Sequence, residues 1–165
     1  MKVDDETRKQ VDELLSAIEI DDAVVHEIRV LGEKGREYLV SLLEEAPSHP
    51  RRDLVHNAIY VLGELGRKDD ITALLKLIDS SNEDFQIRAV HALGRLDVGF
   101  AEEQAFRILE NKDVLSNVKG HALMVLSKVI SPESTERFQK WVELDHGVQE
   151  LRNISAQIMV DIGAK

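Results

Sequence analysis

The amino-acid sequence predicts an all-α fold, an α-solenoid in which about five pairs of short helices follow one another along the chain. Three observations predict it. First, the 165 residues include only 3 Pro and 9 Gly, and helix-favouring Leu, Ala, Glu and Lys are frequent. Second, apolar residues recur three and four positions apart, and no stretch alternates long enough to form a strand. Third, one short motif returns at a nearly constant interval.

The first expected helix covers residues 4–19 and is acidic, so that residues 1–20 form an N-terminal cap. Its apolar face consists of Val11, Leu14, Leu15 and Ile18. Turn-forming and cap-forming residues then interrupt the pattern every 10 to 16 positions. The interruptions lie at residues 21–22, 32–35, 47–50, 66–69, 80–82, 97–99, 111–113, 131–132 and 146–147.

Several of these interruptions carry the chemistry of a helix start. Ser80 with Glu83, or Ser81 with Asp84, fits a capping box, in which side chains and backbone amides bond reciprocally. Pro132 suits a first helical turn, where no amide hydrogen is needed. The glycines are expected in tight turns after helices. We therefore expect about ten short helices and no sheet.

A Leu-Gly motif marks an internal repeat. It occurs at Leu31-Gly32, Leu62-Gly63 and Leu93-Gly94, 31 residues apart, and Leu126-Ser127 follows 33 residues later. The fourth position before the leucine is Glu27, Ala58, Ala89 and Ala122, and the third is Ile28, Ile59, Val90 and Leu123. A further apolar helix lies between successive motifs, over residues 38–43, 71–78, 105–109 and 138–144. One repeat is therefore a pair of helices.

The repeat also predicts the domain organisation. Residues 21–145 contain the clear repeats, residues 146–165 form a degenerate last helix, and residues 1–165 form a single domain. Small Ala and Gly side chains let the helices of a pair approach closely, while Leu, Ile and Val fill the space between neighbouring pairs. A single pair cannot bury its apolar face, so the pairs must stack.

Residues 87–96, preceded by residues 74–79, resemble the HEAT-like repeat that is also found in phycobilisome lyases. Residues 57–66 resemble it equally well. The sequence departs from the pattern at His26 and Asn57, which stand where the repeat has Arg, and at Ser127, which replaces Gly. The resemblance implies that the second helix of each pair lines a concave face.

When the positions of these second helices that are expected to be buried are set aside, three outward positions remain in each repeat. They are His26, Arg29 and Glu33; Asn57, Tyr60 and Glu64; Arg88, His91 and Arg95; and His121, Met124 and Lys128. Their formal charge is +2 in a chain of net charge −10. Tyr, Arg and Met are enriched in the cores of interfaces. We therefore predict a partner-binding surface made of His26, Arg29, Asn57, Tyr60, Arg88, His91, Arg95, His121, Met124 and Lys128.

Catalytic chemistry has little support in the sequence. Some HEAT-like proteins are di-iron hydroxylases with several His-Glu pairs on successive inner helices, and here only His26-Glu27 has that form. The acidic pairs at residues 4–5, 21–22, 44–45, 69–70 and 102–103 are interpreted as solvated groups at helix ends. Trp141 and Phe138 are assigned to the core. We predict no catalytic residue, no metal site and no cofactor.

The function that we favour is a non-enzymatic scaffold that binds another protein through the concave surface, and that is a monomer when unbound. One alternative is an acidic immunity-type or antitoxin-type inhibitor of a basic toxin or nuclease, because residues 1–50 carry 6 basic and 13 acidic side chains. Another is an accessory subunit or enzyme of the phycobilin lyase type, as the resemblance allows. A DNA-repair glycosylase would need a more basic groove.

Composition limits location and partners further. The chain contains no Cys, so disulfides, Cys-ligated metals and thiol catalysis are excluded. No apolar run approaches the roughly 20 residues of a membrane span, and residues 1–6 lack the apolar stretch of a secretion signal. We expect a cytoplasmic protein without a membrane or nucleic-acid partner.

Overall fold

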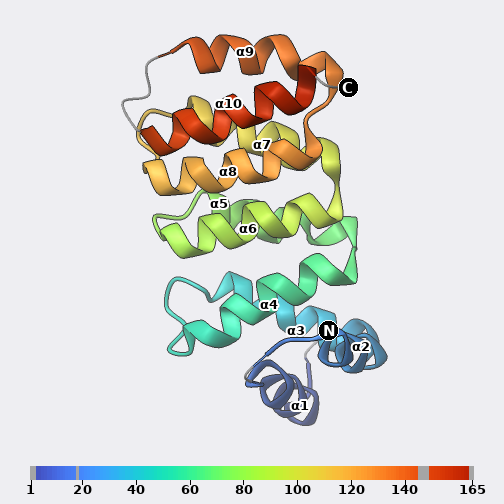
Figure 1. The fold of residues 1–165 in the computed structure, drawn as a ribbon. Coiled ribbons are helices and arrows are strands. Elements are labelled where there is room, and N and C mark those ends of the chain that lie inside the picture. Colours follow the sequence, from blue (N-terminus) through green and yellow to red (C-terminus); the bar gives the residue numbers. More distant parts are fainter. Residues whose placement is uncertain (1–2, 18, 145–148, 164–165) are drawn as a thin grey trace. The chain divides into compact units, whose positions relative to one another are not determined.

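The computed structural model describes residues 3–17, 19–144 and 149–163, and within these ranges it contains ten α-helices, two 3-10 turns and no strand (Figure 1). The helices are α1 Asp5–Leu15, α2 Asp22–Val30, α3 Gly32–Glu44, α4 Arg52–Leu65, α5 Ile71–Ile78, α6 Glu83–Leu96, α7 Val98–Glu110, α8 Ser116–Val129, α9 Thr135–Glu143 and α10 Gln149–Gly163. The 3-10 turns are Lys68–Asp70 and Pro132–Ser134. The all-α prediction is confirmed. The turn predicted at residues 146–147 lies outside the described residues.

The chain divides into two compact units, residues 1–96 and 97–165. In the first unit, α1 packs on α2, α3 on α4 and α5 on α6, while α4 also packs on α6. In the second unit, α7 packs on α8, α9 on α10, and α8 on α10. Each unit is therefore a stack of helical pairs, which is the arrangement of an α-solenoid. That residues 1–165 form a single domain stays a prediction.

The repeated columns form the cores of the two units. Ala58, Ala89 and Ala122 are fully buried, as the repeat predicts. The neighbouring column, Ile28, Ile59, Val90 and Leu123, is also buried. The first repeat differs, because Glu27 is exposed and Leu31 is half-buried at the C-cap of α2. Its motif therefore marks the end of a helix, whereas Leu62, Leu93 and Leu126 lie inside helices.

Gly63 shows what the small residues of the motif do. A Cβ atom added at Gly63 would lie 3.1 Å from the Cα atom of Ala92, so α4 and α6 approach each other closely at this point. These two helices belong to neighbouring pairs. The prediction that Gly brings together the helices of one pair is therefore wrong here, because the close approach joins two successive repeats.

The helix ends confirm some of the predicted caps and correct others. Asp4 and Asp21 cap α1 and α2, because their carboxylates accept hydrogen bonds from the amides of Thr7 and Val24. The amide of Phe85 donates to the side chain of Asn82, so Asn82 caps α6, and not Ser80 or Ser81 as predicted. Gly32 and Gly66 have positive φ angles of 64° and 72°, as expected of glycines at helix ends. Gly35, Gly63 and Gly120 lie inside helices, so the prediction that glycines mark turns is wrong for them.

The acidic pair at residues 69–70 was interpreted as solvated, and for Asp70 this is wrong. Asp70 is only 1% exposed, and its carboxylate lies 2.8 Å from the guanidinium of Arg36. This ion pair connects α3 to the start of α5, across two successive repeats.

Within the described residues, no helix is both long and apolar enough to span a membrane.

Candidate functional site

The residues of the predicted binding surface all lie on second helices of the pairs. In the first unit they are His26 and Arg29 on α2, Asn57 and Tyr60 on α4, and Arg88, His91 and Arg95 on α6; in the second unit they are His121, Met124 and Lys128 on α8. None of them is buried. Glu33 does not belong with them, because α2 ends at Val30 and Glu33 lies in the first turn of α3.

Three helices of the first unit meet at one cluster of these side chains. The Arg95 guanidinium from α6 lies over the Tyr60 ring from α4, 4.9 Å from its centre. The Nε atom of the same guanidinium forms an ion pair with the Glu64 carboxylate, at 2.7 Å. Arg29 from α2 reaches the backbone carbonyl of Glu64, at 3.5 Å. The structure therefore brings Arg29, Tyr60 and Arg95 together, with Glu64 at the centre.

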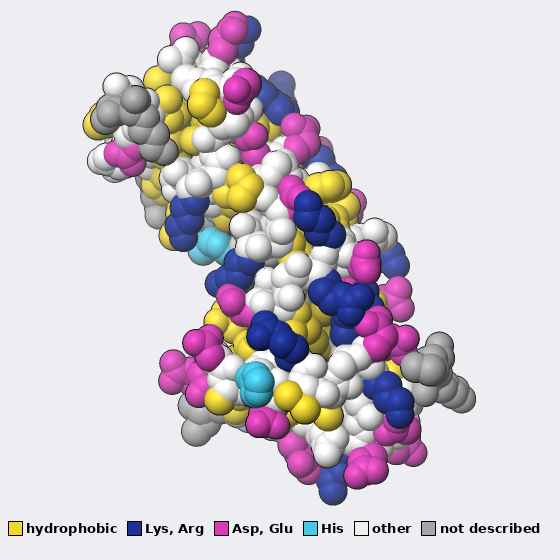
Figure 2. Space-filling model, turned by 90° about the vertical axis from the view of Figure 1, so that its right-hand side faces the viewer, with side chains coloured by type: hydrophobic (Ala, Val, Ile, Leu, Met, Phe, Trp, Pro, Cys, Tyr) yellow, Lys and Arg dark blue, Asp and Glu magenta, His cyan; other side chains and the backbone are white. Residues whose placement is uncertain are grey.

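The position of this cluster has an electrostatic cause. Arg29, Glu64 and Arg95 lie in the last turns of α2, α4 and α6, where the final carbonyl groups have no partner inside the helix. Arginine side chains are favourable there because those ends carry partial negative charge. In the lower part of Figure 2, Lys, Arg and His side chains gather on one face of this unit, with acidic side chains along its edges. We call His26, Arg29, Tyr60, Arg88, His91 and Arg95 the α4–α6 surface.

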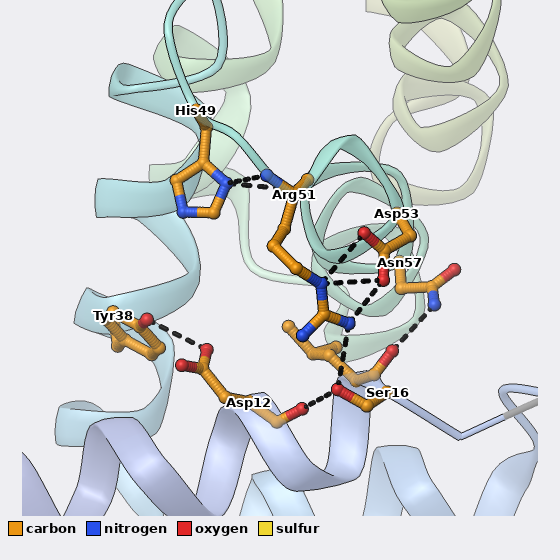
Figure 3. Close-up of polar contacts among 8 residues, drawn as sticks. Asp12, Ser16, Tyr38, His49, Arg51, Asp53 and Asn57 are labelled. Carbon is orange, nitrogen blue, oxygen red and sulfur yellow. Dashed lines mark hydrogen bonds and ion pairs between the residues drawn. The ribbon is translucent and has the colours of Figure 1, made fainter.

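Asn57 has a structural task that the repeat pattern does not reveal. Its side-chain amide donates to the backbone carbonyl of Leu15 at 2.8 Å, and Figure 3 shows it pointing from α4 to the end of α1. Leu15 is the last residue of α1, so Asn57 satisfies one of the free carbonyls of that helix. We therefore leave Asn57 out of the α4–α6 surface.

The polar contacts around Asn57 hold α1 against the second pair (Figure 3). The Tyr38 hydroxyl of α3 donates to Asp12 of α1 at 2.8 Å, and burial raises the pKa of Tyr38 to about 12, assisted by that hydrogen bond. Arg51 donates to Ser16 at 3.2 Å and also binds Asp53. The Nδ1 atom of His49 accepts the backbone amide of Arg51. His49 and Tyr38 therefore have structural roles within the first unit.

Arg88 is the cation of the α4–α6 surface that is most available to a partner. It is exposed, and no ion pair to it is present among the described residues. Its charge also acts on His56 of α4, whose pKa is lowered first by burial and then by Arg88 and Arg52. His56 lies edge-on to Phe85, with the ring centres 5.4 Å apart, so it belongs to the packing beneath this surface.

The remaining predicted residues lie in the second unit. Met124 is 47% exposed and Lys128 is exposed, whereas His121 is half-buried. Ser127, which replaces the repeat's Gly, is exposed and donates its hydroxyl to the Met124 carbonyl at 2.8 Å. The Ser therefore occupies an exposed position, whereas Gly63 at the same place in its repeat is buried.

A second charged cluster escaped the sequence-based interpretation. Glu33 binds both Arg36 and Arg67, and Arg36 in turn reaches the buried Asp70. These residues come from two turns that are more than 30 positions apart, so local spacing could not reveal them. The sequence carried one signal of this cluster: charged residues follow Leu31-Gly32 in one turn and Gly66-Arg67 in the other. Across the described part of the chain, no three His, Asp or Glu side chains converge as ligands of a metal ion.

The stacked helical pairs and the repeated Ala, Leu and Gly columns define a helical-repeat protein. A family model described as HEAT repeats matches residues 11–94, just over half of the chain, and the chain belongs to this family. No curated protein matches the sequence. The finer resemblance to phycobilisome-lyase repeats stays a prediction. HEAT repeats commonly act as protein-interaction scaffolds and are generally not enzymes.

Proposed function

We propose that this protein is a non-enzymatic scaffold that binds a partner protein through the α4–α6 surface. The single observation that carries the proposal is the fixed position of Arg95, held over the Tyr60 ring by its bond to Glu64. Tyr and Arg are the residue types that most often dominate binding energy at interfaces. Here both are accessible to solvent, and each contacts the other within the free chain.

Fixing these side chains in advance favours binding. An arginine loses a large part of its rotamer freedom when it is immobilised, at a cost of about 1–2 kcal/mol. The contacts with Tyr60 and Glu64 meet part of that cost within the free protein. A partner that stacks on the same ring or guanidinium edge therefore binds with a smaller loss of entropy.

The charges of the surface indicate which partners fit. Arg88 has no counter-ion among the described residues, while Arg95 pairs with the Glu64 carboxylate and Arg29 reaches the backbone carbonyl of the same residue. A partner that contributes Asp or Glu side chains would meet complementary charge, even though the chain as a whole has a net charge of −10.

Affinity capture with matched variants tests this proposal. Wild-type protein, Arg88→Glu and Tyr60→Ala are immobilised, and proteins retained from a lysate of the native host are identified by mass spectrometry. The control is Lys140→Glu, an exposed residue of α9 that undergoes the same change of charge as Arg88→Glu. We expect a protein that wild type and the control retain and both surface variants lose. Equal retention by all four proteins, with unchanged circular dichroism, would contradict the proposal.

A second candidate function has support from the first two helices. A shallow groove of about 330 Å³ lies between α1 and α2, and its lining combines Leu14 and Leu31 with Glu13 and Glu27. Apolar contacts framed by carboxylates suit a basic partner, as an acidic inhibitor of a toxin or nuclease would require. Binding of this kind should weaken after Glu13→Lys and Glu27→Lys, and its association rate should fall steeply with salt.

A further inference from the structure

The second unit contains a groove of about 520 Å³ that the proposed function does not use. It lies where α7 and α9 end and where α8 and α10 begin, on the same side of this unit in Figure 1. Its apolar lining is provided by Leu109, Trp141, Leu144 and Leu151. The size falls in the range of sites that enclose one ligand or a few side chains.

The buried side chain of Trp141 lines the groove, and its indole N–H is hydrogen-bonded within the chain. Trp141 is 4% exposed, and its indole N–H donates to the backbone carbonyl of Leu109 at 3.0 Å. Its ring also stacks with Phe138, with the ring centres 6.2 Å apart. At the edge, Leu144 is 63% exposed and follows the last turn of α9. A leucine so exposed beside a buried tryptophan leaves apolar surface in contact with water.

The rim of the groove is basic. Lys112 and Lys119 line it, and among the described residues neither forms an ion pair. Burial lowers the pKa of the Lys119 ammonium, and Asp113 opposes that effect from nearby. Glu110 also lines the groove, but both of its carboxylate oxygens accept hydrogen bonds from Arg137, at 2.7 and 2.8 Å. The two lysines are therefore the charges left to meet a ligand.

We propose that this groove binds an acidic, amphipathic peptide segment of a partner protein. Apolar side chains of the segment rest on Trp141 and Leu144, and its carboxylates meet Lys112 and Lys119. Peptide helices that present apolar residues every third or fourth position bind grooves of this kind. The described residues that line the groove all belong to the second unit, whereas the α4–α6 surface belongs to the first.

The chain contains a single Trp, so the fluorescence of Trp141 reports directly on this groove. The probe is a capped synthetic peptide of about twelve residues, with Leu at every third or fourth position and Glu elsewhere. A comparison peptide has Lys in place of each Glu. We expect the acidic peptide to change the emission of Trp141 in a saturable way, and the basic peptide to leave it unchanged.

Variants assign the binding to the groove. Lys112→Glu combined with Lys119→Gln is expected to weaken the acidic peptide about tenfold, and Leu144→Ser, at an exposed position, by a similar factor. Lys128→Glu is the matched control, because Lys128 is exposed on the same helix as Lys119 but does not line the groove. Its affinity should stay within about twofold of wild type. The proposal is overturned if no saturable change occurs, if the basic peptide binds equally well, or if folded variants bind like wild type.

Discussion

Arg36 in the first unit and Arg137 in the second each connect successive repeats, and their surroundings differ sharply. In the first unit, Arg36 of α3 reaches Asp70 before α5, and these side chains are 14% and 0% exposed. In the second unit, Arg137 of α9 binds Glu103 and Glu110 of α7, and these three side chains are 37%, 63% and 44% exposed. The first contact is a buried pair, whereas the second is an ionic fork in contact with water.

The difference shows how burial changes what an ion pair contributes. Burial raises the pKa of Asp70 in spite of the nearby Arg36, so removing this carboxylate from water costs more than the attraction returns. Arg137 lowers the pKa of Glu110, and the desolvation that opposes it is smaller. Arg137 also lies over the Phe106 ring, 4.3 Å from its centre. The buried pair therefore adds little net stability although breaking it at one end is costly, whereas the exposed fork adds modest stability.

The largest expected effect comes from breaking the buried pair. Asp70→Ala leaves the largely buried Arg36 guanidinium with the half-exposed Glu33 as its remaining partner, which we expect to lower the free energy of unfolding by about 3 kcal/mol. Urea denaturation followed by circular dichroism measures this loss. The double variant Arg36→Met with Asp70→Leu should recover most of it, because two apolar side chains need no counter-charge. A double variant as unstable as Asp70→Ala would contradict this account.

The glycines of the two units offer a second contrast. Gly63→Val places atoms against the backbone of Ala92, 3.1 Å from the nearest point, so we expect a loss of about 2 kcal/mol from overpacking. In the second unit, a Cβ at Gly120 would meet Leu151 at 3.8 Å, an ordinary contact. Gly120→Ala should therefore stabilise the protein by about 0.5–1 kcal/mol through helix propensity. Thermal unfolding of the two variants beside wild type checks both signs.

The carboxylates of Asp70 and Glu110 predict opposite dependences of folding stability on pH. The folded pKa of Asp70 is raised, so its contribution is greatest below its ordinary value of 3.8 and is lost as pH rises through the folded pKa. The folded pKa of Glu110 is lowered, so its contribution is present above its ordinary value of 4.5 and is lost as pH falls through the folded pKa. We expect the stability of wild type relative to Asp70→Asn to fall with increasing pH, and relative to Glu110→Gln to rise.

Unfolding free energies measured between about pH 3 and pH 7 test these slopes. For Glu110→Gln the difference at pH 7 should be below about 1 kcal/mol, because the fork is exposed and screened by salt. If the stability differences for Asp70→Asn and Glu110→Gln changed with pH in the same direction, burial would not explain the difference between the Arg36 and Arg137 ion pairs.

The smallest expected effect on stability is at the α4–α6 surface. Arg95→Ala removes the contact with the Tyr60 ring and the bond to Glu64, both partly exposed, so we expect a loss of only about 0.5–1 kcal/mol. The same variant should weaken partner binding much more than this. Unfolding experiments and binding measurements on one preparation separate the two effects, and equal losses in both would assign Arg95 to folding alone.

The sequence predicted the parts of this fold that repeat. Ala58, Ala89 and Ala122 lie in the core because the Leu anchors place them on the same stripe of successive helices, and helical periodicity alone is enough to find that stripe. The α5 boundaries, residues 71–78, agree with the prediction, because strong turn residues lie on both sides. The family follows from the same columns.

What the sequence did not reveal depends on contacts between distant turns. Asn57 occupies an outward position of the repeat, yet it bonds to the carbonyl of Leu15, 42 positions earlier. Asp70 stands among charged residues that indicate a solvated turn, yet it is buried and pairs with Arg36 of α3. Helical periodicity assigns a side chain to a face of its own helix, but not to the helix end that approaches that face. The stacking of Arg95 on Tyr60 has the same origin.

Hydroxyl-radical footprinting of the complex tests the central claim most directly. The method labels accessible side chains, and Tyr60 on α4, Leu14 on α1 and Leu144 on α9 report on the three surfaces described above. With a captured partner bound, we expect protection of Tyr60 and of neighbouring side chains on α4 and α6, while Leu14 stays as reactive as in the free protein. Protection confined to α1 and α2, with Tyr60 unchanged, would contradict binding through the α4–α6 surface.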